Sequence, residues 1–419
     1  MKKNLFLLAA LAVSLAFTSC SKDDDKNDNS QKEYTTEEAQ NLDYTSDNAR
    51  AWGNYAANVA KLLQEDAQTL YNKWNGGYAA AFKAHNGEST DYTSAESCIE
   101  QIIDGCVDIA NEVGESKIGG PYDSYKAGNT QEALYAVESW YSWHSRDDYK
   151  NNILSIANSL VGKRLENDPS EYDYRTLAQN VMAGTATFGD NIMEQCMKAG
   201  YVGGNSTLMQ SAIKVWTLTL AAWTAIDNIQ QPFRNNIGST EAKEAMDACA
   251  ELVDGLKALK NAIGQDTTID WDPTVAQFVD VVAVPTYKDL ADKAKTLYNA
   301  VYAFQANPSD AAFQTACNAW LSARQPWETS EAFLFGPVSE LGLDPNMDSW
   351  PLDAIGIANL LQSQNWSAMN WSGEYEEMDE DDEDASSDQA KAIAAAQSVR
   401  GFHTLEFLLF KDGQARKVK

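Results

Sequence analysis

Proline, histidine, cysteine and basic charge are all scarce in this sequence of 419 residues. It has 10 prolines, 3 histidines and 6 cysteines, and 32 Lys and Arg residues stand against 61 Asp and Glu residues, for a formal net charge of −29. Proteins that bind nucleic acid need clustered basic side chains to neutralise phosphates, and no basic stripe occurs here. We therefore expect no nucleic-acid partner. Alternating runs of β-branched residues, which are typical of strands, are nearly absent.

Cysteine usage argues against both a disulfide framework and a structural zinc site. An odd number of cysteines follows Cys20, so they cannot all pair. Cys98 and Cys106 fall in one helical pattern, about 12 Å apart along its axis, which is too far for a disulfide. No Cys-x-x-Cys pair and no Cys/His spacing typical of zinc is present. We interpret these residues as mostly buried, small apolar side chains: Cys98, Cys106, Cys196, Cys249 and Cys317.

Apolar residues recur at helical spacing over most of the chain, and Ala and Leu are abundant. Helix starts are often well marked, as in Asn307-Pro308-Ser309-Asp310. The pattern predicts an all-α fold, built of antiparallel helical bundles with short loops. The predicted helices cover roughly residues 45–75, 95–113, 130–165, 173–199, 206–231, 240–263, 286–305, 309–325 and 390–410.

The first residues predict export. A pair of lysines precedes an apolar stretch at 5–17, which is too short to span a bilayer. The following Phe17-Thr18-Ser19-Cys20 resembles a bacterial lipobox, with Phe17 where Leu is usual. We therefore expect residues 1–19 to be a signal peptide and Cys20 to be acylated, so that its lipid chains anchor the protein to a membrane. The alternative is an ordinary secretory signal with an incidental cysteine.

Two polar segments are expected to stay unfolded. Residues 20–43 are predicted to form a flexible acidic tether, because they contain too little apolar surface to fold. Within it, residues 21–25 are similar to the acidic export signal of surface lipoproteins in the Bacteroidetes, which implies an outer-membrane lipoprotein at the cell surface or facing the periplasm. Residues 374–388 carry ten carboxylates. We interpret them as a solvated loop, and the alternative is a weak collector of cations.

The helix at 401–410 is the most informative segment. His403 and Glu406 are three residues apart, so on a helix they share one face. Gly401, just before them, has no side chain and would let another group approach the backbone closely. A lone histidine on an apolar helix is more often a core residue than a ligand, so the pair alone does not establish a site.

Other clusters contain aromatic and charged residues. One run holds Trp320, Arg324, Trp327 and Glu331 and continues to Trp350-Pro351. Tryptophan at helical spacing is more often core than site, and Arg324 could simply pair with Glu331 two turns away. Two further segments are 108–118, which includes Glu112, and 138–145, which includes Glu138 and Ser142.

Together these segments resemble the imelysin-like family, whose hallmark is the motif Gly-x-His-x-x-Glu, matched here by Gly401, His403 and Glu406. The resemblance implies two related helical bundles packed together. The order of the segments departs from the usual one: residues 271–419 look like the first half of the family and residues 44–270 like its second half. A circular permutation would explain this order, and it requires the two ends of the folded chain to lie near each other.

The resemblance also implies a function. The family has been associated with bacterial iron uptake and with peptidase activity, so His403 and Glu406 are candidate ligands for iron or zinc, and the partner would be an iron source or a protein of an uptake system. The remaining candidates would line the same cleft: Gly401, Arg324, Trp327, Glu331, Trp350, Glu112, Glu138 and Ser142.

Proteolysis is the less favoured alternative. A zinc peptidase needs three protein ligands and a general base, whereas His-x-x-Glu supplies two ligands at most, and His-Glu-x-x-His is absent. A metal-free binding module, in which His403 and Glu406 join two bundles by hydrogen bonds, is a further alternative. Whether the protein is an enzyme is left open by the sequence.

Overall fold

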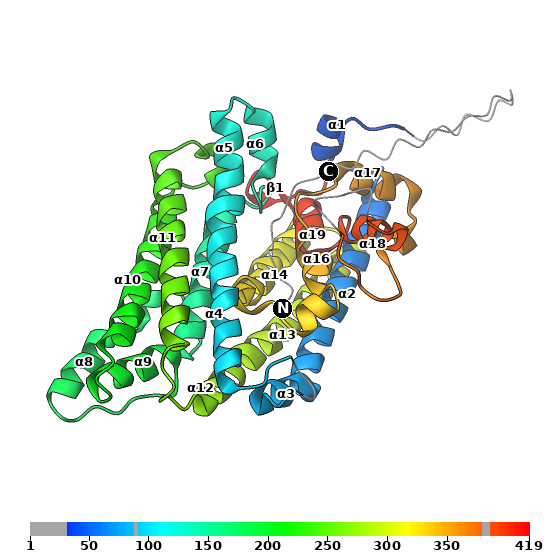
Figure 1. Ribbon diagram of the computed structural model, residues 1–419. Coiled ribbons are helices and arrows are strands. Elements are labelled where there is room, and N and C mark those ends of the chain that lie inside the picture. Colours follow the sequence, from blue (N-terminus) through cyan, green and yellow to red (C-terminus); the bar gives the residue numbers. More distant parts are fainter. Residues whose placement is uncertain (1–31, 88–90, 379–385) are drawn as a thin grey trace, which may run out of the picture.

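The computed structural model describes residues 32–87, 91–378 and 386–419, and most of them are helical (Figure 1). The expected all-α class is confirmed. The strands of this part are two residues long and form one hairpin, β1 (Phe410–Lys411) and β2 (Gln414–Ala415). The predicted signal peptide and Cys20 lie outside the described residues, as do most of the predicted tether and the centre of the acidic segment.

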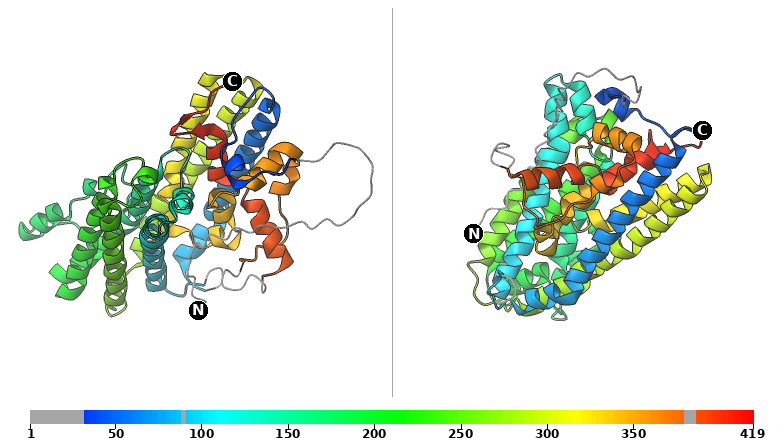
Figure 2. Two further views of the ribbon diagram at one scale, coloured as in Figure 1. Left: turned by 90° about the horizontal axis from the view of Figure 1, so that it is seen from above. Right: turned by 90° about the vertical axis from the view of Figure 1, so that its right-hand side faces the viewer.

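One group of helices brings together distant parts of the chain. Helix α13 (Val284–Ala306) packs along both α2 (Ala49–Lys73) and α14 (Asp310–Glu328). Helix α19 (Gly401–Leu409) packs against α2 and α14 and completes this first bundle. Figures 1 and 2 show that α2 lies beside helices from the last third of the chain. The packing thus groups α2 with residues 271–419, although the sequence placed it in the 44–270 unit.

The second bundle is continuous in sequence. Its main helices are α4 (Ala95–Asn111), α7 (Ser145–Val161), α10 (Ser206–Asn228) and α11 (Thr240–Ile263), each of which packs on at least two of the others. Shorter helices extend its two ends: α5 (Gly120–Lys126), α6 (Thr130–Ala136), α8 (Tyr174–Met182) and α9 (Ile192–Tyr201).

Short helical segments connect and cover the two bundles. The α-helices among them are α1 (Thr36–Gln40), α3 (Ala79–Ala84), α12 (Asp272–Gln277), α15 (Pro337–Glu340), α16 (Leu343–Asp348), α17 (Ala354–Ser363) and α18 (Asp388–Gln397). The π-helical segments are η1 (Trp74–Tyr78), η2 (Glu112–Gly119) and η5 (Phe278–Ala283), and the 3₁₀ turns are η3 (Pro169–Glu171), η4 (Phe233–Asn235), η6 (Glu331–Phe333) and η7 (Trp366–Met369).

Two of the predicted helices are each interrupted by a loop in the structure, so these two predictions were wrong at their centres. The segment 130–165 breaks between α6 and α7, and 173–199 breaks between α8 and α9. In the first break, the 137–144 loop, Ser139 and Trp143 have positive φ angles of 50° and 63°, which a helix does not allow. This loop holds two of the candidate site residues.

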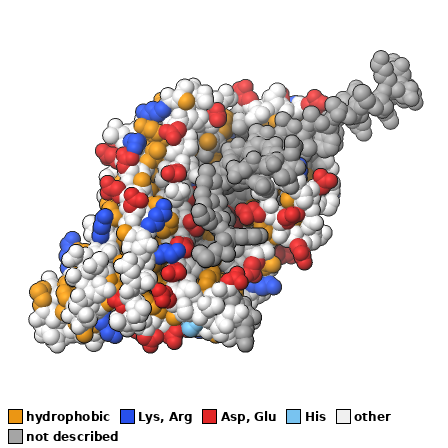
Figure 3. Space-filling model, viewed as in Figure 1, with side chains coloured by type: hydrophobic (Ala, Val, Ile, Leu, Met, Phe, Trp, Pro, Cys, Tyr) orange, Lys and Arg blue, Asp and Glu red, His pale blue; other side chains and the backbone are white. Residues whose placement is uncertain are grey.

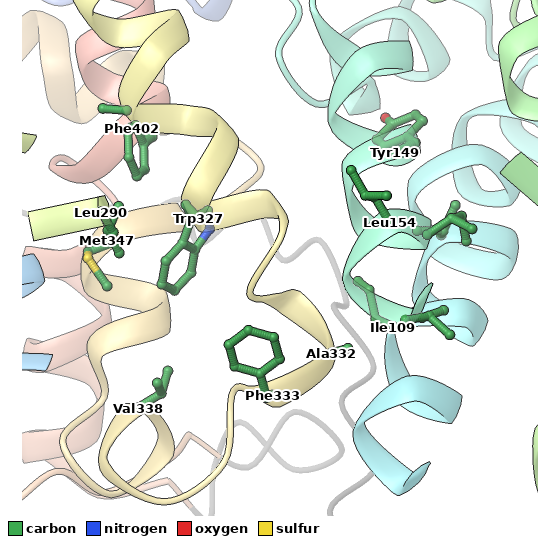
Figure 4. Close-up of a cluster of buried hydrophobic side chains, with 14 of the residues drawn as sticks. Ile109, Tyr149, Leu154, Leu290, Trp327, Ala332, Phe333, Val338, Met347 and Phe402 are labelled. Atoms are coloured by element: carbon green, nitrogen blue, oxygen red, sulfur yellow. The ribbon is translucent and has the colours of Figure 1, made fainter. Parts of the chain in front are cut away.

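The two bundles share one hydrophobic core (Figure 4). Trp327 and Phe333, at the end of α14 and in η6, lie on one side of the contact, and Ile109 and Leu154, on α4 and α7, lie on the other. At Gly105 in α4, an added Cβ would lie only 2.1 Å from the carbonyl oxygen of Ala332. Glycine at this position therefore lets η6 pack directly against α4.

The end of the chain lies against the segment that precedes α2. Arg416 Nη1 lies 2.6 Å from Asp43 Oδ1 and 3.1 Å from the carbonyl oxygen of Leu42, and Lys419 Nζ lies 2.5 Å from Asp43 Oδ2. This is the proximity that a permuted chain requires.

Several other expectations can be compared with the described residues. The five cysteines after Cys20 are buried and unpaired, as predicted. On the face drawn in Figure 3, Lys and Arg side chains are scattered among acidic ones and form no continuous basic surface. Among the described helices, none combines the length and apolar character needed to cross a membrane.

Candidate functional site

The glycine of the Gly-x-His-x-x-Glu motif brings α16 onto the start of α19. Gly401 has a φ of 86°, in the region that disfavours residues with a side chain. A Cβ added there would lie 2.5 Å from the carbonyl oxygen of Met347. The last turn of α16 thus touches the first turn of α19. As a result, Asp348 comes within reach of His403.

His403 is fully buried and has acidic partners on both ring nitrogens. Its Nε2 lies 3.1 Å from Glu138 Oε1 and 3.1 Å from Asp348 Oδ1, and its Nδ1 lies 3.3 Å from Glu406 Oε2. Burial by itself would lower the pKa of His403, but the charge of Asp348 and the hydrogen bonds to Asp348 and Glu138 outweigh it and hold the pKa well above its usual value. A protonated ring in this position would have a carboxylate acceptor for each of its two N–H groups.

The 137–144 loop of the second bundle supplies the facing groups. Glu138 reaches His403 from this loop, and the backbone N–H of Ser142 donates to Glu406 Oε1 over 2.7 Å. Ser145 Oγ donates to the carbonyl oxygen of Glu138 over 2.5 Å, which fixes the start of the loop on α7. The site is therefore built from both bundles.

Arg324, on α14, forms ion pairs with several acidic groups of the site. Its fully buried guanidinium lies 3.1 Å from Glu138 Oε1 and 2.5 Å from Glu328 Oε1, and it also pairs with Asp348 and Asp148. Its partner on its own helix is Glu328, four residues on, whereas the sequence suggested Glu331 as its partner. Desolvation opposes its charge, but the surrounding carboxylates raise its pKa well above the usual value.

Lys117 and two indole rings complete the surroundings. Lys117 Nζ lies 3.0 Å from Glu138 Oε2 and 3.4 Å from Glu112 Oε1. Trp327 Nε1 donates to Asp348 Oδ2 over 2.6 Å. The Trp350 ring packs against His403, with its centroid at 4.8 Å and its plane tilted by 62°. These contacts hold the charged groups in fixed positions inside an apolar shell.

The surroundings lower the pKa of some carboxyl groups of the site and raise the pKa of others. Burial would raise the pKa of Glu138, but Lys117 and the hydrogen bond to His403 bring it down to about 2, and Arg324 likewise depresses the pKa of Asp348. For several carboxyl groups around Lys117, by contrast, burial dominates and raises the pKa. It does so for Glu112, Glu328 and Glu331, and it raises the pKa of Asp344 to about 8.

The donor set around His403 fits a metal ion. Glu138, Asp348 and His403 each offer a ligand atom, and these atoms lie within 4.8 Å of one another. One imidazole and two carboxylates form a set that suits iron, manganese or zinc. Glu406 lies on the other ring nitrogen. From there it orients the ring, as the outer partners of metal-bound histidines do.

The structure brings the predicted residues together and adds several that the sequence did not single out. The predicted cleft residues Gly401, Arg324, Trp327, Glu331, Trp350, Glu112, Glu138 and Ser142 all lie at or beside the centre that holds His403 and Glu406. The residues not assigned a role were Asp348, Lys117, Glu328, Asp344, Asp148 and His144. The signal for Asp348 was weak: it is a carboxylate two residues before Trp350. His144 is tied to the site through Asp148, with Nδ1 2.7 Å from Asp148 Oδ1.

Comparisons with known proteins point to one family. The family model described as Imelysin, peptidase M75, matches residues 23–262 and 283–419. A crystal structure of an imelysin peptidase from Bacteroides ovatus is 49% identical, with a TM-score of 0.77, and the match covers 91% of this chain and 100% of that one.

A curated relative matches over a shorter stretch. Iron-regulated protein A from Synechococcus elongatus is 39% identical over 103 residues, which are 25% of this chain and 29% of the relative. The chain thus spans less than a third of that relative's length in this match.

Proposed function

The chain belongs to the imelysin family, and we propose that it is a cell-envelope lipoprotein that binds iron, or an iron-containing ligand, between its two bundles. The observation that carries the proposal is the donor set of His403, Glu138 and Asp348. Iron is favoured over other metals because carboxylate and imidazole ligands suit it and because one relative is called iron-regulated. A role in iron uptake, together with an iron source or an uptake-system protein as partner, is part of this proposal.

The three proposed ligands contact one another in this structure, so metal binding would have to replace these contacts. His403 Nε2 would have to lose its proton before it could ligate a metal, because only the neutral imidazole has a free lone pair. Arg324 and Lys117 contact the same carboxylates and partly neutralise them. A ligand that carries its own negative charge, such as an iron chelate, would gain from these two cations.

Equilibrium dialysis with metal analysis tests the proposal. The chain from residue 32 onward would be loaded with ferrous iron without oxygen, with ferric iron as its citrate complex, and with zinc. We expect one ion to bind at the His403 centre and the His403→Ala variant to lose at least roughly tenfold in affinity. His85→Ala is a matched control, because His85 directly follows α3, outside this site, and pairs with Asp272 at 2.8 Å. Equal affinity in wild type and the His403→Ala variant would overturn the proposal.

Metallopeptidase activity is the second candidate. It is favoured by the similarity to a structure described as an imelysin peptidase. The three donors would suffice for a catalytic zinc ion, but His403 is fully buried and Glu138 nearly so, and a catalytic metal needs an open position for water and substrate. Chelator-sensitive cleavage of an unfolded polypeptide, lost in His403→Ala but kept in His85→Ala, would support this candidate. If no metal binds and no cleavage occurs, a metal-free binding module becomes the better description.

The lipid anchor is proposed from the sequence. Acylation at Cys20 would tether the helical body to the outer membrane, at the cell surface or facing the periplasm. Labelling of cells with a palmitate analogue tests it, because a Cys20→Ser variant should lose the label. Protease treatment of intact cells then distinguishes the two faces.

A further inference from the structure

Glu331 is a buried carboxylate that forms no hydrogen bond or ion pair with its side chain among the described residues. It is 7% exposed. A buried carboxylate that stays unpaired is unfavourable unless it takes up a proton or a cation. Its place in η6 is fixed, because Gly105 lets the neighbouring Ala332 pack directly on α4.

The unpaired carboxylate faces two others. Ligand oxygens of Glu331, Glu328 and Asp348 lie within 4.8 Å of one another. Asp348 Oδ1 is used by Arg324 and His403, but Asp348 Oδ2 accepts a single hydrogen bond, from Trp327. A carboxylate oxygen has two lone pairs, so Asp348 Oδ2 can still ligate a cation.

An amide side chain borders the same cluster. Asn152 on α7 is fully buried, and its Nδ2 donates to Glu328 Oε2 over 2.6 Å. Its Oδ1 is also buried and has no hydrogen-bond partner among the residues that the structure describes. A rotation of this amide exchanges its oxygen and nitrogen, which would turn the oxygen toward Glu328. Amide carbonyl oxygens are common ligands of hard cations.

The nearby fixed cations do not satisfy this cluster. Arg324 forms an ion pair with Glu328, but it also forms ion pairs with Glu138, Asp348 and Asp148. Lys117 forms ion pairs with Glu138 and Glu112. Within the described residues neither forms an ion pair with Glu331. More carboxylates than cations are therefore buried at this junction of the two bundles.

We infer that Glu328, Glu331 and Asp348 form a second cation site, with Asn152 as a further oxygen ligand, beside the His403 centre. Its donors are all oxygen, so it would take a hard divalent cation of the Mn²⁺ or Mg²⁺ class. Asp348 belongs to both donor groups and would join the two sites into one centre for two cations. The inference extends the proposed function, but it rests on different side chains, and either can fail alone.

Manganese is the probe, because its anomalous scattering locates each ion. Crystals of the chain from residue 32 onward would be grown with Mn²⁺, and its binding in solution would be followed by electron paramagnetic resonance. Wild type should show a peak between Glu331, Glu328 and Asp348. Glu331→Gln should remove this peak and weaken Mn²⁺ binding at least tenfold, whereas His403→Ala should leave it in place. Glu340→Gln is the matched control, because Glu340 is exposed nine residues further on.

The outcomes separate the two proposals. Loss of the Glu331 peak in Glu331→Gln, with iron binding at His403 retained, supports a second site. If wild type shows no Mn²⁺ peak at Glu331 at saturating metal, the cluster is a set of protonated acids and the inference is overturned. If Glu331→Gln keeps the peak and the affinity, the inference is overturned as well. Thermal melting of each variant without metal confirms that it folds.

Discussion

The backbone N–H of Ser142 donates to Glu406 Oε1 over 2.7 Å, and the other oxygen of the same carboxylate lies 3.3 Å from His403 Nδ1. Glu406 thus connects the 137–144 loop of one bundle to the histidine on the other. One oxygen accepts from the loop and the other contacts the histidine, and substitutions of Glu406 can distinguish these two interactions.

Removing the Glu406 carboxylate should weaken metal binding more than it lowers the stability of the fold. Glu406→Ala leaves Ser142 N–H and His403 Nδ1 without an acceptor, so the ring is no longer held in one orientation, and iron affinity should fall about 10–100-fold. Glu406→Gln keeps an acceptor for Ser142 and should lose less. Isothermal titration of both variants beside wild type measures the difference. Equal affinity in all three would show that Glu406 does not orient the ring.

Substitution of the motif glycine should destabilise the whole protein. Gly401→Ala combines a positive φ with a Cβ that would meet the Met347 carbonyl group, and the cost should be roughly 2–4 kcal/mol. Urea unfolding measures it. Gly76→Ala is the control, because Gly76 has helical backbone and no atom within 4 Å of an added Cβ, so its effect should be small. A similar effect of both substitutions would refute the packing argument.

Arg324 should be the costliest single side chain to remove. Arg324→Met leaves several buried carboxylates unpaired and should lower the free energy of unfolding by about 3–5 kcal/mol. Arg164→Met tests an exposed pair, since Arg164 lies 2.8 Å from Asp289 with a side chain that is 37% exposed, and the loss there should be under about 1 kcal/mol. Chemical denaturation of the two variants is the measurement, and a cost for Arg324 no larger than that for Arg164 would contradict this account.

Metal affinity and stability should depend on pH with opposite signs. The pKa of His403 is raised, so at neutral pH a metal must displace a proton from Nε2, and apparent affinity should rise with pH until the pH exceeds that pKa. Without metal, the raised pKa stabilises the fold below the ordinary histidine pKa of about 6.5, and this contribution is lost as the pH rises through the folded value. Titrations at about pH 6, 7 and 8, in buffers of different ionisation enthalpy, count the protons released. A pH-independent affinity would indicate that His403 is not a ligand.

A rearranged chain tests the permuted order. Lys419 lies beside Asp43, so a short Gly-Ser linker can join residue 419 to residue 43, and a new start can be placed at residue 271, before α12. This chain lacks α1, which packs on α17, but every other helix keeps its remaining neighbours, so it should fold with nearly the same helical content and bind metal with the same stoichiometry. Circular dichroism and dialysis measure both. A chain that fails to fold would show that the order of the bundles is not interchangeable.

The helical class could be predicted from the sequence because it depends on local periodicity. The break at 137–144 could not, because it depends on distant partners. Glu138 is held by Lys117, Arg324 and His403, and Ser142 by Glu406, and these contacts favour a loop with two positive φ angles over continued helix. Asp348 was missed for a similar reason. Its role follows from the contact between Gly401 and Met347, which a linear motif does not contain.

The five buried cysteines have a consequence for where this protein can function. Burial raises the pKa of the Cys98, Cys249 and Cys317 thiols to about 12, so almost none of each is thiolate at neutral pH. Thiolate is the species that attacks disulfides and is oxidised by peroxides. In oxidising surroundings the folded body is therefore resistant to mixed disulfides and to sulfenic acid formation. These five thiols can therefore stay free under oxidising conditions without becoming cross-linked.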